Sequence, residues 1–363
     1  MSYGSALMDI QQFEERKKEH IRHALDTAHQ ASGLGGLDEI QLIHEALPDL
    51  DFEEVSLETS CLGIKLKTPF YIAGMTAGHA DAFELNRSLA HAAQTRGWAM
   101  GVGSQRRDLE NSGEKASGET LDQWKRLRQD APDLVLFGNV GISQITSVSI
   151  SKIRSLVDAI GAQALAVHAN ALQECLQPEG TPQFRGALSA LKTLCRELGV
   201  PVILKETGCG FSEATLGRLA DCGLGAVDVS GLGGTHWGRI EGARAARQGD
   251  ETLQFRAAQT LANWGVSTAD SVINGFKKLK PQTEIWASGG VRSGLESAKL
   301  IALGAHRVGY AKPALEAALQ GAHQLNAWME RQEFELKVAL FCTGMSRPGA
   351  LRGKEGVWKK SGS

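Results

Sequence analysis

The chain has 363 residues, of which 42% are hydrophobic, 22% are charged and 6% are aromatic, and it contains 42 glycines. This composition is typical of a well-buried α/β fold with many tight turns, and it excludes a disordered or fibrous protein. The formal net charge of -2 gives no basic excess that would bind a nucleic-acid backbone or an anionic membrane. We therefore expect neither nucleic acid nor a membrane as a partner.

No apolar run comes near the roughly 20 residues that span a bilayer, and residues 1–15 lack the blocks of a signal peptide. We therefore expect a soluble, cytoplasmic protein. The six cysteines form no CxxC pair and no disulfide-framework spacing, which predicts buried, reduced thiols to which we assign no role.

Eight short apolar segments alternate with helical stretches, and this alternation predicts an α/β fold in which a parallel sheet closes into a (β/α)8 TIM barrel. We expect strands over Pro69–Met75, Trp98–Gly103, Leu134–Val140, Ala164–Asn170, Pro201–Thr207, Ala226–Gly231, Glu284–Gly289 and Arg307–Ala311. Amphipathic spacing predicts crossover helices over Ala82–Thr95, Ile150–Ile160, Ala187–Leu198, Glu213–Ala220 and Gly294–Leu303.

The remaining segments are read as additions to one barrel domain over 1–363. Residues 1–68 are expected to pack on the barrel as an extension that contains a charged helix, Phe13–Leu25, and Glu316–Gly344 reads as further helix. The connections Arg106–Asp133 and Gly233–Thr283, which follow strands two and six, are unusually long, with an insertion over 232–283. Because long connections are usually functional or mobile, we expect one to form a lid and the other to add helices beside the site.

Polar residues cluster at the carboxyl ends of the predicted strands, where barrels of this kind carry their active sites. The strongest motif is Ser288-Gly289-Gly290-Val291-Arg292-Ser293-Gly294, which follows strand seven and precedes a helix. Together with Gly309-Tyr310-Ala311-Lys312 it is typical of a phosphate site, because glycines let backbone N–H groups approach the anion. The glycine loop Gly231–Thr235 is weak support when taken alone.

Lys205 ends an apolar strand, so its ammonium is expected to project into the mouth of the barrel. Two roles remain open at this point, namely neutralising a reduced flavin or forming a Schiff base.

A second polar group consists of His168 and Asn170, two apart on one strand, with Gln173 and Glu174 in the adjoining turn. A lone carboxylate with amide neighbours suits Mg2+, whereas no His/Cys set has zinc spacing. Arg16 and His20 share one face of the N-terminal helix beside Lys17, a pattern that by itself is usually a solvated face.

Taken in order, these stretches resemble the type 2 isopentenyl diphosphate isomerases, which are FMN enzymes. The motifs that carry the resemblance are Arg16-Lys17-x-x-His20-Ile21, His44-x-Ala46-Leu47-Pro48, Met75-Thr76-Ala77-Gly78, Val102-Gly103-Ser104-Gln105-Arg106, His168-x-Asn170-x-x-Gln173-Glu174, Pro178-Glu179-Gly180, Lys205-Glu206, Ser230-Gly231-x-Gly233-Gly234-Thr235 and Ala287-Ser288-Gly289-Gly290. Two departures are Ala77, where the family usually has Gly, and Gln177, where an acidic residue is usual before Pro178.

The resemblance implies three sets of site residues. It implies FMN contacts from Met75, Thr76, Ala77, Ser104, Asn139, Lys205, Ser230, Thr235, Gly290, Val291, Arg292, Ala311 and Lys312. It implies substrate contacts from Arg16, Lys17, His20, Ser104, Arg106, His168, Asn170 and Gln173. It also implies a Mg2+ ligand in Glu174, catalytic roles for Gln173 and Lys205, and a homo-oligomer, as a tetramer or octamer.

The activity that the resemblance implies is the interconversion of isopentenyl and dimethylallyl diphosphate in isoprenoid biosynthesis, with reduced FMN as the acid/base and NADPH or NADH as its reductant. The alternative is an FMN-dependent oxidoreductase of the 2-hydroxy-acid oxidase or IMP dehydrogenase type. That class needs a His-Gly-x-Arg pattern or a nucleophilic cysteine loop, and only Cys209 keeps it open. A flavin-binding redox sensor without turnover is a third alternative.

Overall fold

The structure is a computed structural model that describes residues 19–75, 82–110, 115–246 and 252–361. Eight parallel strands form a closed barrel in the order β10-β11-β4-β5-β6-β7-β8-β9. They are β4 (Phe70–Ile72), β5 (Ala99–Gly101), β6 (Leu136–Gly141), β7 (Ala164–Ala169), β8 (Val202–Glu206), β9 (Ala226–Asp228), β10 (Glu284–Ala287) and β11 (Arg307–Tyr310). All eight predicted strands are confirmed. Most are shorter than predicted, because the polar residues at their carboxyl ends leave the ladder and enter the loops.

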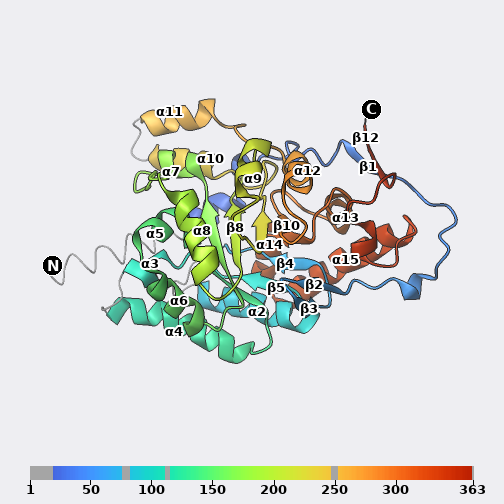
Figure 1. The fold of residues 1–363 in the computed structure, drawn as a ribbon, viewed down its shortest axis with the longest axis horizontal. Coiled ribbons are helices and arrows are strands. Elements are labelled where there is room, and N and C mark those ends of the chain that lie inside the picture. Colours follow the sequence, from blue (N-terminus) through green and yellow to red (C-terminus); the bar gives the residue numbers. More distant parts are fainter. Residues whose placement is uncertain (1–18, 76–81, 111–114, 247–251, 362–363) are drawn as a thin grey trace.

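The helices surround the barrel, as Figure 1 shows. The predicted crossover helices correspond to α2 (Phe83–Arg96), α6 (Ile150–Ala159), α8 (Ala187–Glu197), α9 (Glu213–Leu219) and α13 (Gly294–Ala302). Two further short helices precede crossover helices, namely α5 (Ile142–Ser147) and α7 (Ala171–Leu176). The apolar faces of these helices pack against the outer faces of the strands, as for Leu89, Leu156 and Leu194, which are all buried.

The barrel interior is filled by side chains at its amino-terminal end. Tyr71, Phe137 and Trp286 pack there against one another, with ring centroids 4.9 and 5.1 Å apart for the two pairs that include Trp286. A two-stranded hairpin, β2 (Thr59–Cys61) and β3 (Ile64–Leu66), packs against this layer. The fully buried guanidinium of Arg307 donates to backbone carbonyls of Ser60 and Thr68 and so ties the hairpin to β11. Because this end is packed, the opposite end is left for the site.

The two long connections are largely helical. Residues 106–133 contain α3 (Arg106–Glu110) and α4 (Lys115–Asp130), and residues 233–283 contain α10 (Trp237–Ala245), α11 (Leu253–Thr260) and α12 (Thr268–Lys278). Helices α10 and α11 lie beside α7 at one end of the molecule (Figure 1). The second connection therefore adds helices as predicted, whereas the lid and the boundaries 1–68 and 232–283 stay predictions.

The described residues before β4 and after β11 also form regular structure. Residues 19–25 are helical, so the carboxyl part of the predicted helix 13–25 is confirmed and the rest lies outside the described residues. The predicted helical tail is α14 (Lys312–Leu319) and α15 (Ala322–Phe341), and β1 (Ile40–Leu42) pairs with β12 (Trp358–Lys360). The short elements η1 (Thr27–His29), η2 (Phe52–Glu54) and α16 (Pro348–Leu351) complete the list. No helix among the described residues is long and apolar enough to cross a membrane.

Candidate active site

A cavity of about 900 Å3 lies at the carboxyl ends of the barrel strands. Its lining comes from the ends of the eight strands and the segments that follow them, which include α5, α7, α10 and α14, and also from α15 and the segment 20–32. The predicted site residues that line it are His20, Met75, Ser104, Arg106, Asn139, His168, Gln173, Glu174, Lys205, Ser230, Thr235, Gly290, Val291, Arg292, Ala311 and Lys312. Residues that are far apart in the sequence thus meet at one site.

Asn170 is the described site residue that does not line the cavity. Its side chain is buried, accepts a hydrogen bond from the backbone N–H of Gln173 at 2.9 Å and donates to Thr207 Oγ1 at 3.0 Å. It therefore caps α7 and positions Gln173, and its substrate contact stays a prediction. The predictions for Arg16, Lys17, Thr76 and Ala77 fall outside the described residues.

One wall of the cavity consists of two glycine loops that pack backbone against backbone. Gly290 has φ +88°, and a Cβ atom built on it would lie 2.2 Å from the carbonyl oxygen of Gly233. Gly289 has φ +101°, and its Cβ would lie 2.3 Å from the carbonyl oxygen of Gly231. Only glycine fits these positions, because a side chain there would drive the loops after β9 and β10 apart. The amino end of α13 follows, and its dipole favours an anion.

Arg292 and Ser230 help to shape this wall. The Arg292 guanidinium donates to the Gly290 carbonyl and to Ser32 Oγ, each at 2.9 Å, so it ties the loop after β10 to the N-terminal segment. Ser230 has φ +34°, a strained conformation for a residue with a side chain. Strain of this kind is usually retained at functional sites.

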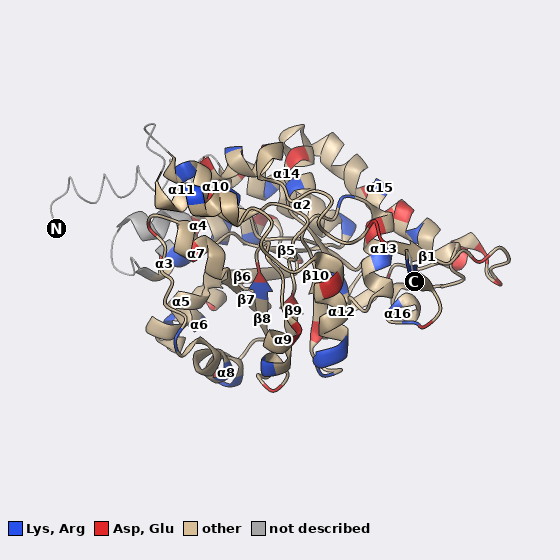
Figure 2. Cartoon of the chain, turned by 90° about the horizontal axis from the view of Figure 1, so that it is seen from above, with Lys and Arg blue, Asp and Glu red and all other residues tan. Residues whose placement is uncertain are grey.

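Lys205 lies at the floor of the cavity, inside the barrel. Its ammonium donates to Asp228 Oδ2 at 2.6 Å and to Ser288 Oγ at 3.2 Å. Figure 2 shows that charged residues lie mainly on the outer helices, whereas the barrel strands are mostly tan, with blue on β8. An ion-paired ammonium is not the neutral amine that Schiff-base formation requires, so the arrangement favours the charge-neutralising role over the nucleophilic one.

His168 is held in one orientation by Asn139. Its Nδ1 lies 2.8 Å from Asn139 Oδ1, while the amide nitrogen of Asn139 donates to the carbonyl oxygen of Val102 at 2.9 Å. Because the amide nitrogen is already used as a donor, the amide oxygen must accept, and His168 Nδ1 carries the proton. Asn139 is fixed in turn by Gln105, whose side-chain oxygen accepts from its backbone N–H. This chain of contacts fixes the orientation of the His168 ring at the cavity.

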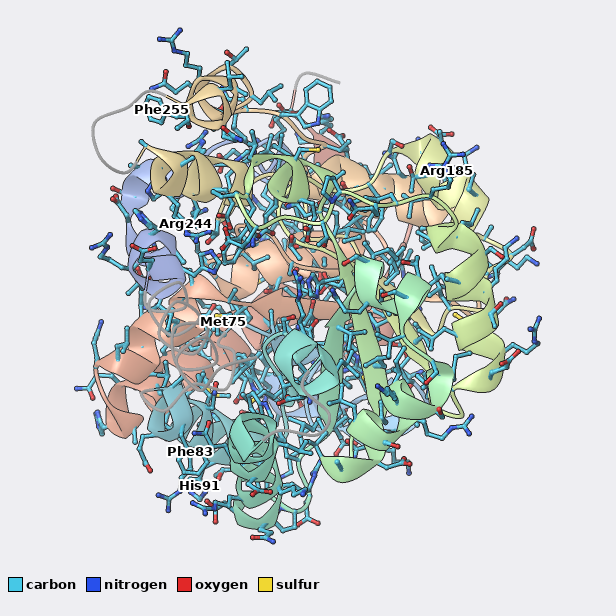
Figure 3. All side chains as sticks on the ribbon, turned by 90° about the vertical axis from the view of Figure 1, so that its left-hand side faces the viewer. Met75, Phe83, His91, Arg185, Arg244 and Phe255 are labelled. Atoms are coloured by element: carbon cyan, nitrogen blue, oxygen red, sulfur yellow. The ribbon has the colours of Figure 1, made fainter. Side chains whose placement is uncertain are left out.

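Gln173 and His20 meet a buried carboxylate on α10. Glu241 Oε1 accepts from Gln173 Nε2 at 3.2 Å and lies 3.0 Å from His20 Nε2. Burial works to raise the pKa of Glu241, but the hydrogen bond from His20 and the charge of Arg244 together hold that pKa below its usual value. Arg244, which is labelled in Figure 3, also pairs with Glu19 and Glu179. The cluster thus links residues 19–20, α7 and α10.

Glu174 faces the cavity with one oxygen already engaged. Its Oε2 accepts from the backbone N–H of Thr181 at 2.7 Å and from the Thr181 hydroxyl at 3.2 Å. No group of three or more His, Cys, Asp or Glu side chains suited to a metal occurs among the described residues. A single carboxylate such as Glu174 could hold a cation that keeps several of its waters, as Mg2+ does in other proteins.

Comparison with known proteins places this site in a family. The family described as FMN-dependent dehydrogenase matches residues 152–358, which is more than half of the chain. Proteins named isopentenyl-diphosphate delta-isomerase are 51% identical in Legionella pneumophila (strain Corby), over 93% of this chain and 95% of that protein, and 51% identical in Bdellovibrio bacteriovorus, over 95% and 97%. The chain belongs to the isopentenyl-diphosphate delta-isomerase family.

A more distant relative carries the same name, and a solved structure shares the fold. The isopentenyl-diphosphate delta-isomerase of Halobacterium salinarum is 39% identical over 93% of this chain and 91% of that protein. A crystal structure of mandelate oxidase with (S)-2-phenylpropionate has a TM-score of 0.62 and 18% identity, and the match covers 90% of this chain and 89% of that one. At that identity the likeness supports the barrel fold alone.

Several residues of the site in this isomerase-family chain were missed by sequence reasoning. Asp228 lies in a short apolar strand, where a lone carboxylate at a strand end was the only signal. Trp237 and Glu241 follow the glycine loop after β9 at helical spacing, and this spacing could have placed both on one face of α10. Glu206 was named in the sequence only as part of the motif Lys205-Glu206, without a role. In the structure it accepts backbone N–H bonds from Gly208 and Gly210, and burial raises its pKa to about 7.

The cysteine prediction is correct in part. All six cysteines are free, as expected, and Cys61 and Cys222 are buried. The expectation of burial is wrong for Cys175, which is exposed on α7. Cys209 is partly buried, and burial raises the pKa of its thiol above the usual value. A thiol in that environment is a poor nucleophile, which disfavours the cysteine-dependent dehydrogenase alternative.

Proposed function

We propose that this chain interconverts isopentenyl diphosphate and dimethylallyl diphosphate, using reduced FMN and Mg2+, with NADPH as the reductant of the flavin. The name of this activity is carried by relatives that are about half identical along nearly the whole chain. The observation that supports it best is the set of residues around the cavity. It combines glycine loops of the phosphate-binding kind, a buried lysine at the floor and an amide that is hydrogen-bonded to a buried carboxylate.

The residues present fit an FMN. Gly289 and Gly290 form a wall that any Cβ would obstruct, and the start of α13 adds a dipole suited to the phosphate. Lys205 at the floor and Asn139 at the side offer hydrogen-bond donors to a ring. When bound in its reduced form, FMN supplies an acid/base group at N5, as the family resemblance implies.

The chain's own residues bind and orient the reactants. Moving the double bond requires one proton to be added to an alkene carbon and another to be removed from its neighbour, with no net redox change. The Gln173 amide N–H donates to Glu241, and we assign the Gln173 amide oxygen to the substrate side. Lys205 holds positive charge at the floor of the cavity. Glu174 is proposed to bind Mg2+, and Arg106 and His168 the diphosphate, together with Arg16 and Lys17.

Further parts of the proposal concern the setting of the reaction. We place the enzyme in the cytoplasm as a homo-oligomer.

Trp237 lies over His20, with ring centroids 5.1 Å apart in an edge-to-face contact. Both rings line the cavity, and so we assign them the exclusion of water from the reacting carbons.

The proposed activity is tested by NMR of isopentenyl diphosphate in 2H2O with holoprotein, Mg2+ and reductant. We expect dimethylallyl diphosphate to form and to carry deuterium. Lys205→Ala should lose most of the turnover while it keeps its circular dichroism spectrum. The matched control is Lys280→Ala, because Lys280 pairs with Asp221 on the surface. Absence of product from the wild type, or wild-type turnover by Lys205→Ala, would overturn the proposal.

A further inference from the structure

Four side chains form a hydrogen-bonded network beneath the cavity, inside the barrel. Asp228 Oδ2 accepts from the Lys205 ammonium and from the Tyr71 hydroxyl, each at 2.6 Å. Asp228 Oδ1 accepts from Ser288 Oγ at 2.8 Å, and Ser288 Oγ in turn lies 3.2 Å from Lys205 Nζ. The four residues come from β8, β9, β4 and the end of β10, so the barrel wall itself fixes their positions.

The network is almost completely removed from solvent. The side chain of Asp228 is 1% exposed and that of Lys205 is 10% exposed. Lys205 and Ser288 line the cavity, whereas Asp228 lies one layer deeper. The cation is therefore the end of the ion pair that faces a ligand, and the anion is shielded behind it.

The charge states within the network follow from burial and contact. Burial, together with the adjacent Asp228 carboxylate, raises the pKa of Tyr71 well above its usual value, so the phenol stays a neutral donor. Asp228 is thus the one anion in the network, and it is satisfied by an ammonium and two hydroxyls. A buried ammonium left without such a partner is strongly disfavoured.

We propose that Asp228 is a positioning residue that holds the Lys205 ammonium at the cavity floor and thereby sets how strongly the site prefers reduced over oxidised FMN. The proposal rests on the FMN binding described above, and it does not depend on which substrate is isomerised. Asp228 acts only through Lys205, because Lys205 is the part of the pair that faces the ligand. Loss of either residue should therefore weaken the preference of the site for reduced over oxidised FMN.

The test is the ratio of the dissociation constants of reduced and oxidised FMN, obtained from the midpoint potential of bound FMN and a titration of the oxidised form. Asp228→Asn should weaken binding of reduced relative to oxidised FMN by roughly tenfold or more, because the Lys205 ammonium is no longer held in place beside the ring. Lys205→Met should shift the ratio in the same direction. The double variant should weaken binding of reduced relative to oxidised FMN no further than Lys205→Met alone, because the carboxylate has nothing left to position.

The matched control removes a carboxylate of similar pairing outside the barrel. Glu333 accepts from Nε and Nη2 of Arg96 at 3.0 and 2.6 Å and from Trp98 Nε1 at 2.7 Å. Glu333→Gln therefore loses an ion pair without changing the cavity floor. Its ratio should equal that of the wild type. If Asp228→Asn does not fold, Asp228→Glu replaces it, and its ratio should lie between those of the wild type and Lys205→Met.

Three outcomes would overturn the positioning role. An unchanged ratio in the Asp228 variant is one, a shift opposite to that of Lys205→Met is the second, and a further equal shift in the Lys205→Met background is the third. A wild-type protein that binds no FMN would instead contradict the proposed cofactor itself, and this inference would fall with it.

Discussion

Replacing Gly290 by alanine should test how closely the two glycine loops of the cavity wall pack against each other. At φ +88°, the new Cβ would lie 2.2 Å from the Gly233 carbonyl oxygen, whereas ordinary contact begins near 3.4 Å. The loops after β9 and β10 must therefore separate by roughly 1 Å in a closely packed wall. The left-handed conformation costs about 1–2 kcal/mol and the overpacking about 1–3 kcal/mol, so the sum is about 2–5 kcal/mol.

This cost should be visible in two measurements. Fluorescence titration should show FMN affinity reduced by about tenfold or more, and urea unfolding of the apoprotein should show lower stability. The matched control is Gly217→Ala, because the Cβ at this position on α9 would meet nothing within 4 Å. Alanine there favours the helix by about 0.5–1 kcal/mol and should leave FMN binding unchanged. Wild-type FMN affinity and stability in Gly290→Ala would refute the reasoning.

Three further substitutions test separate parts of the site and the fold. Glu174→Gln keeps the shape of the side chain but removes its charge, so the Mg2+ concentration for half-maximal turnover should rise about tenfold or more; an unchanged titration would remove Glu174 from the metal site. Gln173→Ala should lower kcat by roughly 100-fold with little change in FMN affinity, and normal kcat would count against its role. Burial, with help from the charges of Arg352 and Arg307, lowers the pKa of His306 from 6.5 to about 3. The folded state therefore loses stability as pH falls below 6.5, by up to about 1.4 kcal/mol per pH unit. In urea titrations at pH 7 and pH 5, His306→Asn should lose less unfolding free energy on acidification than the wild type does. An equal loss in both proteins would disprove the role of His306.

The barrel could be predicted from the sequence because each strand is a short apolar segment between helical stretches. The glycine loop after β10 could also be predicted from the sequence, because Gly289 and Gly290 stand between a strand and a helix. Both features depend on local pattern. The structure adds the reason for the glycines, which is the approach of two backbones from different loops.

The partners of the predicted residues could not be read in the same way. Asp228 pairs with Lys205 across neighbouring strands, and Glu241 reaches Gln173 from a helix 68 positions later in the chain. Such contacts depend on strand order and helix placement, which local periodicity does not encode. Asn170 is the opposite case. The sequence predicts it as the last residue of a strand, whereas in the structure it follows β7 and caps α7.

The most direct test of the account is a count of reductant against product under anaerobic conditions. FMN-loaded protein is reduced once, excess reductant is removed, and isopentenyl diphosphate and Mg2+ are added. We expect many turnovers to dimethylallyl diphosphate for each flavin, with the flavin still reduced at the end, because the reaction has no net redox change. Full activity of the oxidised enzyme kept free of reductant, or oxidation of the flavin in step with product formation, would contradict the account.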